Sequence, residues 1–159
     1  MAFGTGHHAT TRMMIQMMKD LPMRKGKVLD FGSGTGILAI LAAKMDALLI
    51  DAVDIEKPAY ENAIENCQLN DVDVVQIYLG GLEVILDSGY DIILANINRN
   101  VILDSLKALY NKLKRSGILL ISGILQTDEE LVLKAAKEVG FTVDGKKRLD
   151  KWSCISLIS

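Results

Sequence analysis

Short apolar runs recur along this chain and alternate with longer segments in which apolar residues return every three or four positions. The short runs are typical of buried strands, and the wider spacing is typical of amphipathic helices. The pattern predicts strands at residues 27–31, 48–53, 72–78, 90–95 and 118–122. Because these runs are apolar at nearly every position, we expect a parallel sheet that helices cover on both faces.

The helical segments lie between these strands. We expect them at residues 10–21, 35–45, 58–69, 100–113 and 128–139, with a short helix between Gly81 and Gly89. The first segment carries Met13, Met14, Met17 and Met18 at helical spacing. Such a row of methionines predicts a packing face.

The last two predicted strands, residues 142–146 and 152–158, follow each other directly. A short connection between two strands requires antiparallel pairing. The sequence therefore predicts an α/β fold with seven strands, mostly parallel, closed by an antiparallel C-terminal hairpin. The basic cluster of Lys146, Lys147, Arg148 and Lys151 is expected in the short connection of this hairpin, as a solvated turn rather than a phosphate contact.

Length and composition narrow the class of protein. A chain of 159 residues, half of them apolar, is expected to form one domain over residues 1–159. No apolar run approaches the ~20 residues of a membrane span, and the N-terminus lacks the pattern of a signal peptide. The net charge of −2 gives no indication of a nucleic-acid surface. Cys67 and Cys154 lack metal-ligand spacing, so we expect buried free thiols, no metal site and a cytoplasmic location.

The most informative segment is the glycine-rich stretch that follows the first strand. Gly32, Gly34 and Gly36 alternate directly after Asp30, and a helical pattern begins at once. Glycines let the backbone approach a ligand and adopt positive φ, and the helix N-terminus presents unpaired N–H groups. The second strand leads into Asp54, an acid placed to accept hydrogen bonds from two ribose hydroxyls. Together these features predict a site for a nucleoside.

The spacing of the glycines distinguishes between two kinds of nucleoside ligand. The dinucleotide fingerprint is G-x-G-x-x-G, whose third glycine would fall on Ile37. The pattern G-x-G-x-G after Asp30 instead resembles motif I of the class I S-adenosylmethionine-dependent methyltransferases. That resemblance implies a Rossmann-like sheet with an antiparallel closing hairpin, and S-adenosyl-L-methionine as cofactor.

Further stretches resemble one family of such enzymes. The opening Ala2-Phe3-Gly4-Thr5-Gly6-His7-His8-Ala9-Thr10-Thr11, the glycine-rich segment, the Ala52-Val53-Asp54-Ile55 exit, the Ala95-Asn96-Ile97-Asn98 exit and Ser122-Gly123-Ile124-Leu125 are similar to the ribosomal protein L11 methyltransferases. The resemblance implies methylation of lysine side-chain and N-terminal amines of ribosomal protein L11. It also implies that residues 1–159 are the methyltransferase domain alone, because family members carry a substrate-recruiting domain before the opening motif. Met1 would then be internal to a longer protein.

The resemblance also assigns site residues. The positions that match the family's cofactor contacts are Thr11, Gly32, Asp54 and Asn96, and we place Asp30, Gly34, Gly36 and Ile55 in the same cofactor-binding set. For Asp54 the alternative is a helix N-cap, and for Thr11 it is a cap of the first helix. Asp30 either braces the glycine loop through backbone N–H groups or lies near the cofactor's ammonium. His8, within the opening motif, either braces a loop or contacts substrate.

Asn96 is the candidate catalytic residue. At the end of the fourth strand it can orient the cofactor or the amine, and the alternative is a turn-capping role without contact. Methyl transfer from a sulfonium needs mainly alignment of donor and acceptor, and we find no strong catalytic base. The fourth strand is followed by Asn96-Ile97-Asn98 and not by N-P-P-Y, which favours an aliphatic amine over a nucleobase. No acid follows the third strand before Glu83, so contacts to the adenine amino group must come from backbone or from elsewhere.

Three functions remain open from the sequence. The first is a protein methyltransferase of the L11 type, and the second is a methyltransferase for another protein or a small molecule. The third is a cofactor-binding module that is inactive without its recruiting domain. A nicotinamide-dependent dehydrogenase is disfavoured by Ile37 and by the closing hairpin.

Overall fold

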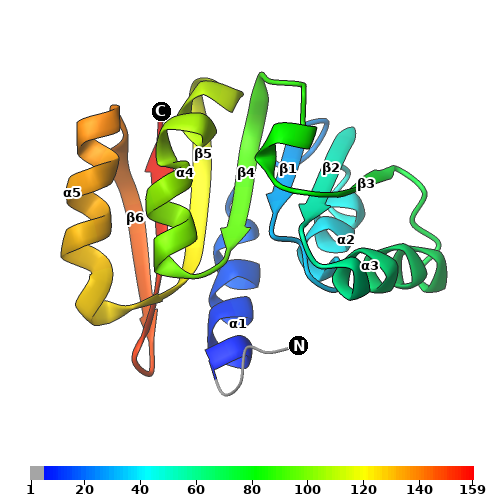
Figure 1. Ribbon diagram of the computed structural model, residues 1–159, viewed down its shortest axis with the longest axis horizontal. Helices are drawn as coiled ribbons and strands as arrows, with labels where there is room; N and C mark the ends of the chain where they lie inside the picture. The colour runs from blue at the N-terminus through cyan, green and yellow to red at the C-terminus, as the bar shows by residue number, and fades with distance from the viewer. Residues whose placement is uncertain (1–5) are drawn as a thin grey trace.

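A seven-stranded sheet forms the centre of the molecule (Figure 1). The computed structural model describes residues 6–159, and side chains from residue 8 onward. The sheet order is β3-β2-β1-β4-β5-β7-β6, with parallel pairing from β3 to β5 and antiparallel pairing of β7 with both β5 and β6. The strands are β1 (Lys27–Phe31), β2 (Leu49–Asp54), β3 (Val75–Leu79), β4 (Tyr90–Asn96), β5 (Leu113–Leu125), β6 (Thr142–Leu149) and β7 (Trp152–Ile158).

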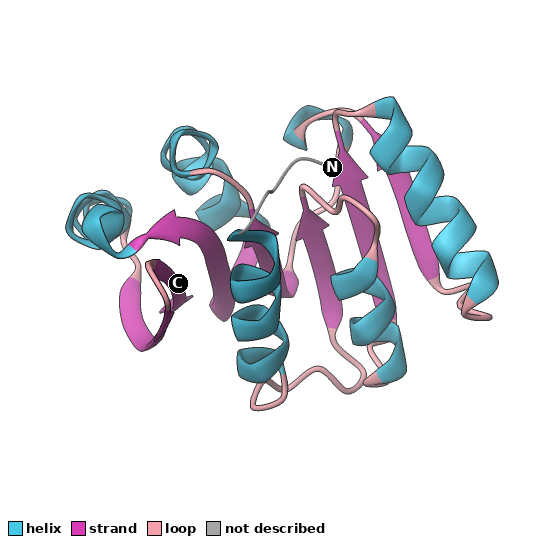
Figure 2. Ribbon diagram, turned by 90° about the horizontal axis from the view of Figure 1, so that it is seen from below, coloured by secondary structure: helices cyan, strands magenta, loops and turns pink. Residues whose placement is uncertain are grey.

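Helices cover both faces of the sheet. Figure 2 shows α1 on the opposite side from α4 and α5. The helices are α1 (Gly6–Met18), α2 (Ile37–Lys44), α3 (Lys57–Leu69), α4 (Arg99–Lys112) and α5 (Glu129–Val139). The predicted α/β fold, its strand number and the antiparallel hairpin are confirmed.

Each face of the sheet has its own apolar core. On the side of α1 and α2, the fully buried Met13, Met14 and Met18 pack with Val28 and Leu94, which confirms the predicted methionine packing face. On the other side, residues of α4 and α5 pack on the alternate positions of β1, β4, β5 and β7. Successive side chains along a strand point to opposite faces of the sheet, so a strand with a core on both faces needs apolar residues at nearly every position.

The parallel strands all end at one edge of the sheet, toward which the β4 arrow points in Figure 1. In register, Phe31 of β1 lies between Val53 of β2 and Ala95 of β4. The residues after these three therefore enter the same space, which is called the carboxyl edge below. The N-terminal end of α1 lies at this edge too (Figure 1).

The first helix differs from its predicted bounds. It ends at Met18 and not at residue 21, and it already includes residues 6–9. The residue before a proline is disfavoured in helical conformation, and Pro22 follows Leu21. The chain turns at Asp20 and Leu21, whose N–H groups bond the Met17 and Met18 carbonyls.

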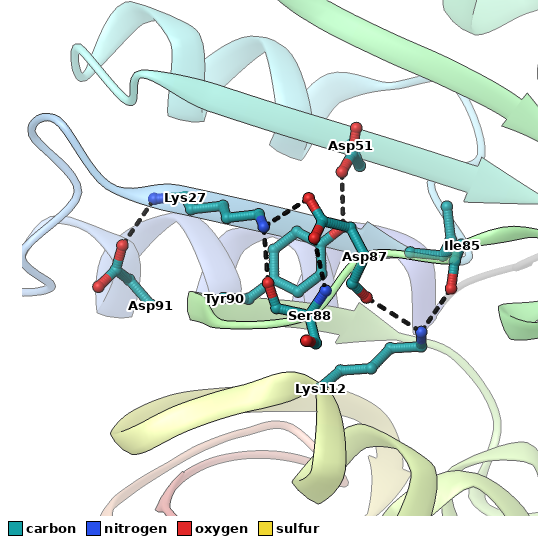
Figure 3. A network of polar contacts seen from close by, with 8 residues as sticks. All are labelled: Lys27, Asp51, Ile85, Asp87, Ser88, Tyr90, Asp91 and Lys112. Carbon is teal, nitrogen blue, oxygen red and sulfur yellow. Dashed lines mark hydrogen bonds and ion pairs between the residues drawn. The ribbon is translucent and has the colours of Figure 1, made fainter.

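The predicted short helix before Gly89 was wrong. Only a single 3₁₀ turn, η1 (Leu82–Val84), forms there. Two lysines take the carbonyls that would continue it, as Figure 3 shows: Lys112 Nζ donates to the Ile85 and Asp87 carbonyls, and Lys27 Nζ donates to the Ser88 carbonyl at 2.6 Å. In a longer helix, backbone N–H groups from the following residues would donate to these carbonyls. Here the following residues belong to β4, which begins at Tyr90.

The basic cluster was also misplaced by the sequence pattern. Lys146, Lys147 and Arg148 lie within β6, which extends to Leu149, and not in a solvated turn. Lys146 Nζ and Arg148 Nη2 contact the nearly buried carboxylate of Glu129 at 3.1 and 2.7 Å. These bonds, the guanidinium of Arg148 foremost, lower the pKa of Glu129 to about 2. Two of the three cations therefore join β6 to the start of α5.

Both cysteines are free and buried, as predicted. Among residues 6–159, no helix is both long enough and apolar enough to cross a membrane.

Candidate functional site

The glycine loop between β1 and α2 is held tightly against β2. The N–H groups of Gly32 and Ser33 both donate to the Val53 carbonyl, at 2.9 and 3.0 Å. Gly34 N–H donates to Asp54 Oδ2 at 2.8 Å. The loop is thus fixed by the end of β2 before any ligand is considered.

All three glycines of this loop have positive φ, between +54° and +83°. A Cβ on Gly32 would lie 2.3 Å from Ile97 Cγ2, and one on Gly36 would lie 3.2 Å from Ala63 Cβ. A Cβ on Gly34 would meet nothing within 4 Å among the described residues. Gly32 and Gly36 are therefore required by packing, whereas Gly34 borders open space at the carboxyl edge.

Asp54 bridges two segments of the site. Its Oδ1 accepts from Glu56 N–H at 2.9 Å, and its Oδ2 accepts from Gly34. Its backbone carbonyl accepts from Gly80 N–H at 2.9 Å, so the turn after β3 is joined to the same point. Each carboxylate oxygen can accept a further hydrogen bond, because an oxygen offers two lone pairs. Ile55, the next residue, is 72% exposed at the rim.

Bracing of the glycine loop was one of two interpretations of Asp30. In the structure it is Asp54 that accepts a hydrogen bond from the loop, through Gly34 N–H. Asp30 is 1% exposed and accepts from the N–H of Ala39, in the first turn of α2. Burial, reinforced by the charge of Asp54 and opposed by the Ala39 N–H, raises the pKa of Asp30 to about 7. Asp30 therefore accepts a hydrogen bond from the first turn of α2 and lies beneath the glycine loop, with a pKa raised to about 7 by burial.

Asn96 ends β4 on the same face of the sheet as Asp30. Asp30 pairs with Leu94 across the strands, and alternate residues share a face. Asn96 is 7% exposed, and its Nδ2 lies 3.4 Å from Thr11 Oγ1 of α1. The turn-capping role belongs to Asn98, whose Oδ1 accepts from Val101 N–H at 3.0 Å. Asn96 is thus held by a partner from the far end of the chain and does not cap the turn.

Three buried side-chain oxygens have no hydrogen-bond partner among the described side chains. They are Asp30 Oδ2, Ser33 Oγ and Asn96 Oδ1. All three belong to the end of β1, the glycine loop or the end of β4. Buried polar atoms in folded proteins are nearly always hydrogen-bonded, so a cluster of exceptions indicates the place of a ligand. The pattern indicates a ligand that brings donors or positive charge.

Comparison with known proteins gives the family of the chain. The model of the family described as ribosomal protein L11 methyltransferase matches residues 1–158. A ribosomal protein L11 methyltransferase of Porphyromonas gingivalis is 39% identical over 98% of this chain and 54% of the relative. One of Chlorobaculum parvum is 41% identical over 96% of this chain and 54% of the relative.

This chain belongs to the ribosomal protein L11 methyltransferase family. A crystal structure of a ribosomal protein L11 methylase from Lactobacillus delbrueckii subsp. bulgaricus has the same fold, with a TM-score of 0.90, 30% identity and coverage of 94% of this chain and 78% of that one. The chain spans about half the length of the curated relatives it matches.

The L11 methyltransferase fold gathers most residues that the sequence singled out. Thr11, Asp30, the three glycines, Asp54 and Asn96 all lie at the carboxyl edge, on or next to the loop. His8 is exposed in α1, the side chain of His7 lies outside the described part, and so do residues 2–5 of the opening motif. Glu83 turns back to accept from Gly81 N–H at 3.0 Å and so stabilises the turn after β3.

Two residues of this family member were missed by the sequence analysis. Ser33 occupies a variable position of the glycine pattern, and its buried Oγ has no hydrogen-bond partner in the described part of the chain. Ile97 is enclosed by the glycines of two loops: a Cβ on Gly123 would lie 2.3 Å from the Ile97 carbonyl oxygen, and one on Gly32 would meet its side chain. The Ser122-Gly123 pair after the fifth apolar run was a usable signal for this contact.

Proposed function

We propose that this chain is the methyltransferase domain of an S-adenosylmethionine-dependent enzyme that methylates amino groups of ribosomal protein L11. The observation that carries the proposal is the cluster of three buried oxygens without partners around the glycine loop. S-adenosylmethionine offers what these acceptors lack, because it carries an ammonium, a sulfonium and two ribose hydroxyls. The residues present therefore fit this cofactor.

Different residues of the proposed cofactor site would contact different parts of the ligand. Asp54 would accept the ribose hydroxyls through its remaining lone pairs, and the exposed Ile55 would contact the base. The open space beside Gly34 leaves room for the ligand backbone. Asp30, Thr11 and Asn96 lie on the side of α1 and α2, and together with Ser33 of the glycine loop they would surround the amino-acid end of the cofactor.

Methyl transfer mainly requires that the methyl donor and the acceptor amine be aligned. S-adenosylmethionine, when bound, supplies an electrophilic methyl group on a positively charged sulfur. The amide of Asn96 presents Oδ1 as an acceptor while Nδ2 is directed to Thr11, which suits an amine N–H. A lysine amine is mostly protonated at its reference pKa of ~10.4, and a desolvated site favours its neutral, nucleophilic form.

The substrate is proposed from the names of the relatives, each a ribosomal protein L11 methyltransferase. A ribosomal substrate and two free buried thiols suit a cytoplasmic enzyme. Because the chain matches about half of each relative's length, we propose that the remaining part of such relatives recruits the substrate and that residues 1–159 carry the chemistry.

The proposed function is tested by calorimetry and by mass spectrometry. We expect S-adenosylmethionine and S-adenosylhomocysteine to bind and NAD to bind far more weakly. We expect methyl groups on amines of ribosomal protein L11, or on a short amine-bearing peptide at high concentration. Tighter binding of NAD than of S-adenosylhomocysteine would contradict the cofactor. Binding without any methylation of protein or peptide would favour the cofactor-binding module.

Asn96→Ala is expected to slow methyl transfer about 10–100-fold while weakening S-adenosylhomocysteine binding much less. The reason is that the free Oδ1 aligns the amine, an interaction that is strongest in the transition state. Asn98→Ala is the matched control: it removes the α4 N-cap, costs about 1 kcal/mol of stability, and should leave the rate per folded molecule unchanged. Equal losses in rate and in binding for Asn96→Ala would show a plain binding role.

A further inference from the structure

A cation stands close to the proposed site, at a place where a helix disfavours it. Arg99 is the first residue of α4 and follows Asn96 by three positions. The N-terminus of a helix carries partial positive charge, so acids are favoured there and cations are not. The first turn of α4 nevertheless contains no acid to balance Arg99. A residue that breaks a local rule beside a site calls for a functional explanation.

Arg99 is balanced by an acid from a different loop. Its Nη1 lies 3.0 Å from Oδ1 of Asp128, in the 3₁₀ turn η2 (Gln126–Asp128) that follows β5. The side chain of Arg99 is 42% exposed, whereas that of Asp128 is only 16% exposed. Figure 1 shows that α4 and α5 both begin at the carboxyl edge. The ion pair therefore joins the exits of β4 and β5 at this edge.

Asp128 is the fixed member of the pair, and Arg99 is the movable one. Leu125 N–H donates to Asp128 Oδ2 at 3.4 Å. Gln126 donates to carbonyls of the β6–β7 turn through its backbone N–H and its side-chain amide, at 2.8 and 2.7 Å. In the described part of the chain, the Arg99 side chain has one other hydrogen-bond partner, the neighbouring Asn100 Oδ1 at 3.2 Å. Without the charge of Asp128, the long Arg99 side chain would be free to turn into the open edge.

The ion pair lies where an acceptor amine can approach. The glycine loop and the end of β2 are proposed to hold the cofactor, so the exits of β4 and β5 border the rest of the carboxyl edge. The exit of β4 is firmly held, because Ile97 N–H bonds the Ser122 carbonyl at 3.2 Å. An acceptor that reaches Asn96 from this side meets the charges of Arg99 and Asp128.

We propose that Asp128 sets the charge preference of the acceptor site: it holds Arg99 in a neutral pair and so admits basic, lysine-bearing segments that an unpaired Arg99 would repel. The inference rests on the proposed function, which supplies the acceptor amine. A partly exposed ion pair contributes little to stability, so its effect lies in where the cation is held. An unpaired Arg99 repels a basic segment and attracts an acidic one. The sign of the effect therefore depends on the charge of the segment.

Two acceptor peptides of equal length test this preference, one with arginines and one with glutamates beside a single lysine. The value of kcat/KM is measured for the wild-type chain and for Asp128→Asn, in which asparagine keeps an acceptor for Leu125 N–H. We expect Asp128→Asn to lower kcat/KM about 3–10-fold for the basic peptide and to raise it for the acidic one, mainly through KM. Both changes should shrink at about 0.5 M salt, because salt screens exposed charges.

A double variant and a control variant separate charge from structure. The Arg99→Gln/Asp128→Asn variant has no cation to release, so it should lie within about twofold of the wild-type chain for both peptides. Asp104→Asn makes the same charge change at an exposed position of α4 and should alter neither value. The affinity for S-adenosylhomocysteine should be the same in every variant. Equal losses with both peptides, or no recovery in the double variant, would overturn the inference and leave the proposed function standing.

Peptide binding gives a second measurement that does not need turnover. The dissociation constants of both peptides, measured by NMR titration with S-adenosylhomocysteine bound, should change in the same directions as KM. If the wild-type chain binds the cofactor product and the peptides but transfers no methyl group, the proposed activity is wrong, and the opposite shifts of the two peptides still decide the inference. A wild-type chain that binds neither peptide at millimolar concentration would contradict both.

Discussion

Replacing Gly32 with alanine is expected to reduce the free energy of unfolding by about 2–5 kcal/mol. Gly32 has a φ of +76°, where an L-residue costs ~1–2 kcal/mol. The new Cβ would also lie 2.3 Å from Ile97 Cγ2, and overpacking of this kind costs ~1–3 kcal/mol. Ile97 cannot retreat easily, because its N–H bonds the Ser122 carbonyl and its own carbonyl lies against Gly123.

Alanine substitutions at two other glycines distinguish the cost of backbone strain from the cost of a steric clash and from the loss of ligand binding. Gly34→Ala places its Cβ in open space, so it should cost ~1–2 kcal/mol and still block S-adenosylhomocysteine. Gly89→Ala, with φ +78° and no atom within 4 Å among described residues, lies outside the site and should cost stability alone. Urea unfolding and calorimetry of the three variants check this order. Equal midpoints for Gly32→Ala and Gly34→Ala would mean that the Ile97 contact gives way without cost.

Asp30→Asn is expected to stabilise the ligand-free protein at pH 8, by about 2–4 kcal/mol. The pKa of Asp30 is raised from its ordinary value of 3.8 to about 7, so between these values the folded state holds a proton that the unfolded state has lost. Stability from this group therefore falls as pH rises from about 4 to 7, and the full cost remains at pH 8. Asparagine carries no charge at any pH and can still accept from Ala39.

Thermal unfolding at two pH values measures this effect. At pH 8 the midpoint of the variant should lie about 5–12 °C above that of the wild-type chain, and at pH 4 the difference should nearly vanish. The same difference at both pH values would show that the gain does not come from the charge of Asp30. If the variant is more stable but binds S-adenosylhomocysteine less well, the wild-type chain keeps Asp30 for ligand binding at a cost in stability.

Much of the architecture could be predicted because it depends on local pattern. The strand at residues 27–31 was placed correctly, since its apolar residues lie close together and a glycine turn follows it directly. Where a boundary depended on distant groups, the prediction failed. Lys27 and Lys112 hold the carbonyls of residues 85, 87 and 88, and nothing within that segment shows that they would.

The candidate site shows the same division. The spacing of the three glycines, the strand before them and the acid at Asp54 follow from the order of residues alone, because a short loop and the strands beside it leave few arrangements. Which carboxylate braces the loop depended on the tertiary structure. Asp54 reaches Gly34 across neighbouring strands, and Asp30 turns to α2.

Charge and hydrogen-bond partners were decided only by packing. Asn96 Nδ2 contacts Thr11, 85 positions away, and its Oδ1 has no partner within residues 8–159. The pKa of Asp30 is raised because the surrounding helices and strands exclude water from it. The sequence pattern predicted a solvated cluster for Lys146 and Arg148, but in the folded chain both pair with Glu129 at the start of α5. Periodicity and turn chemistry act over a few residues, whereas burial and pairing depend on segments that meet only in the folded chain.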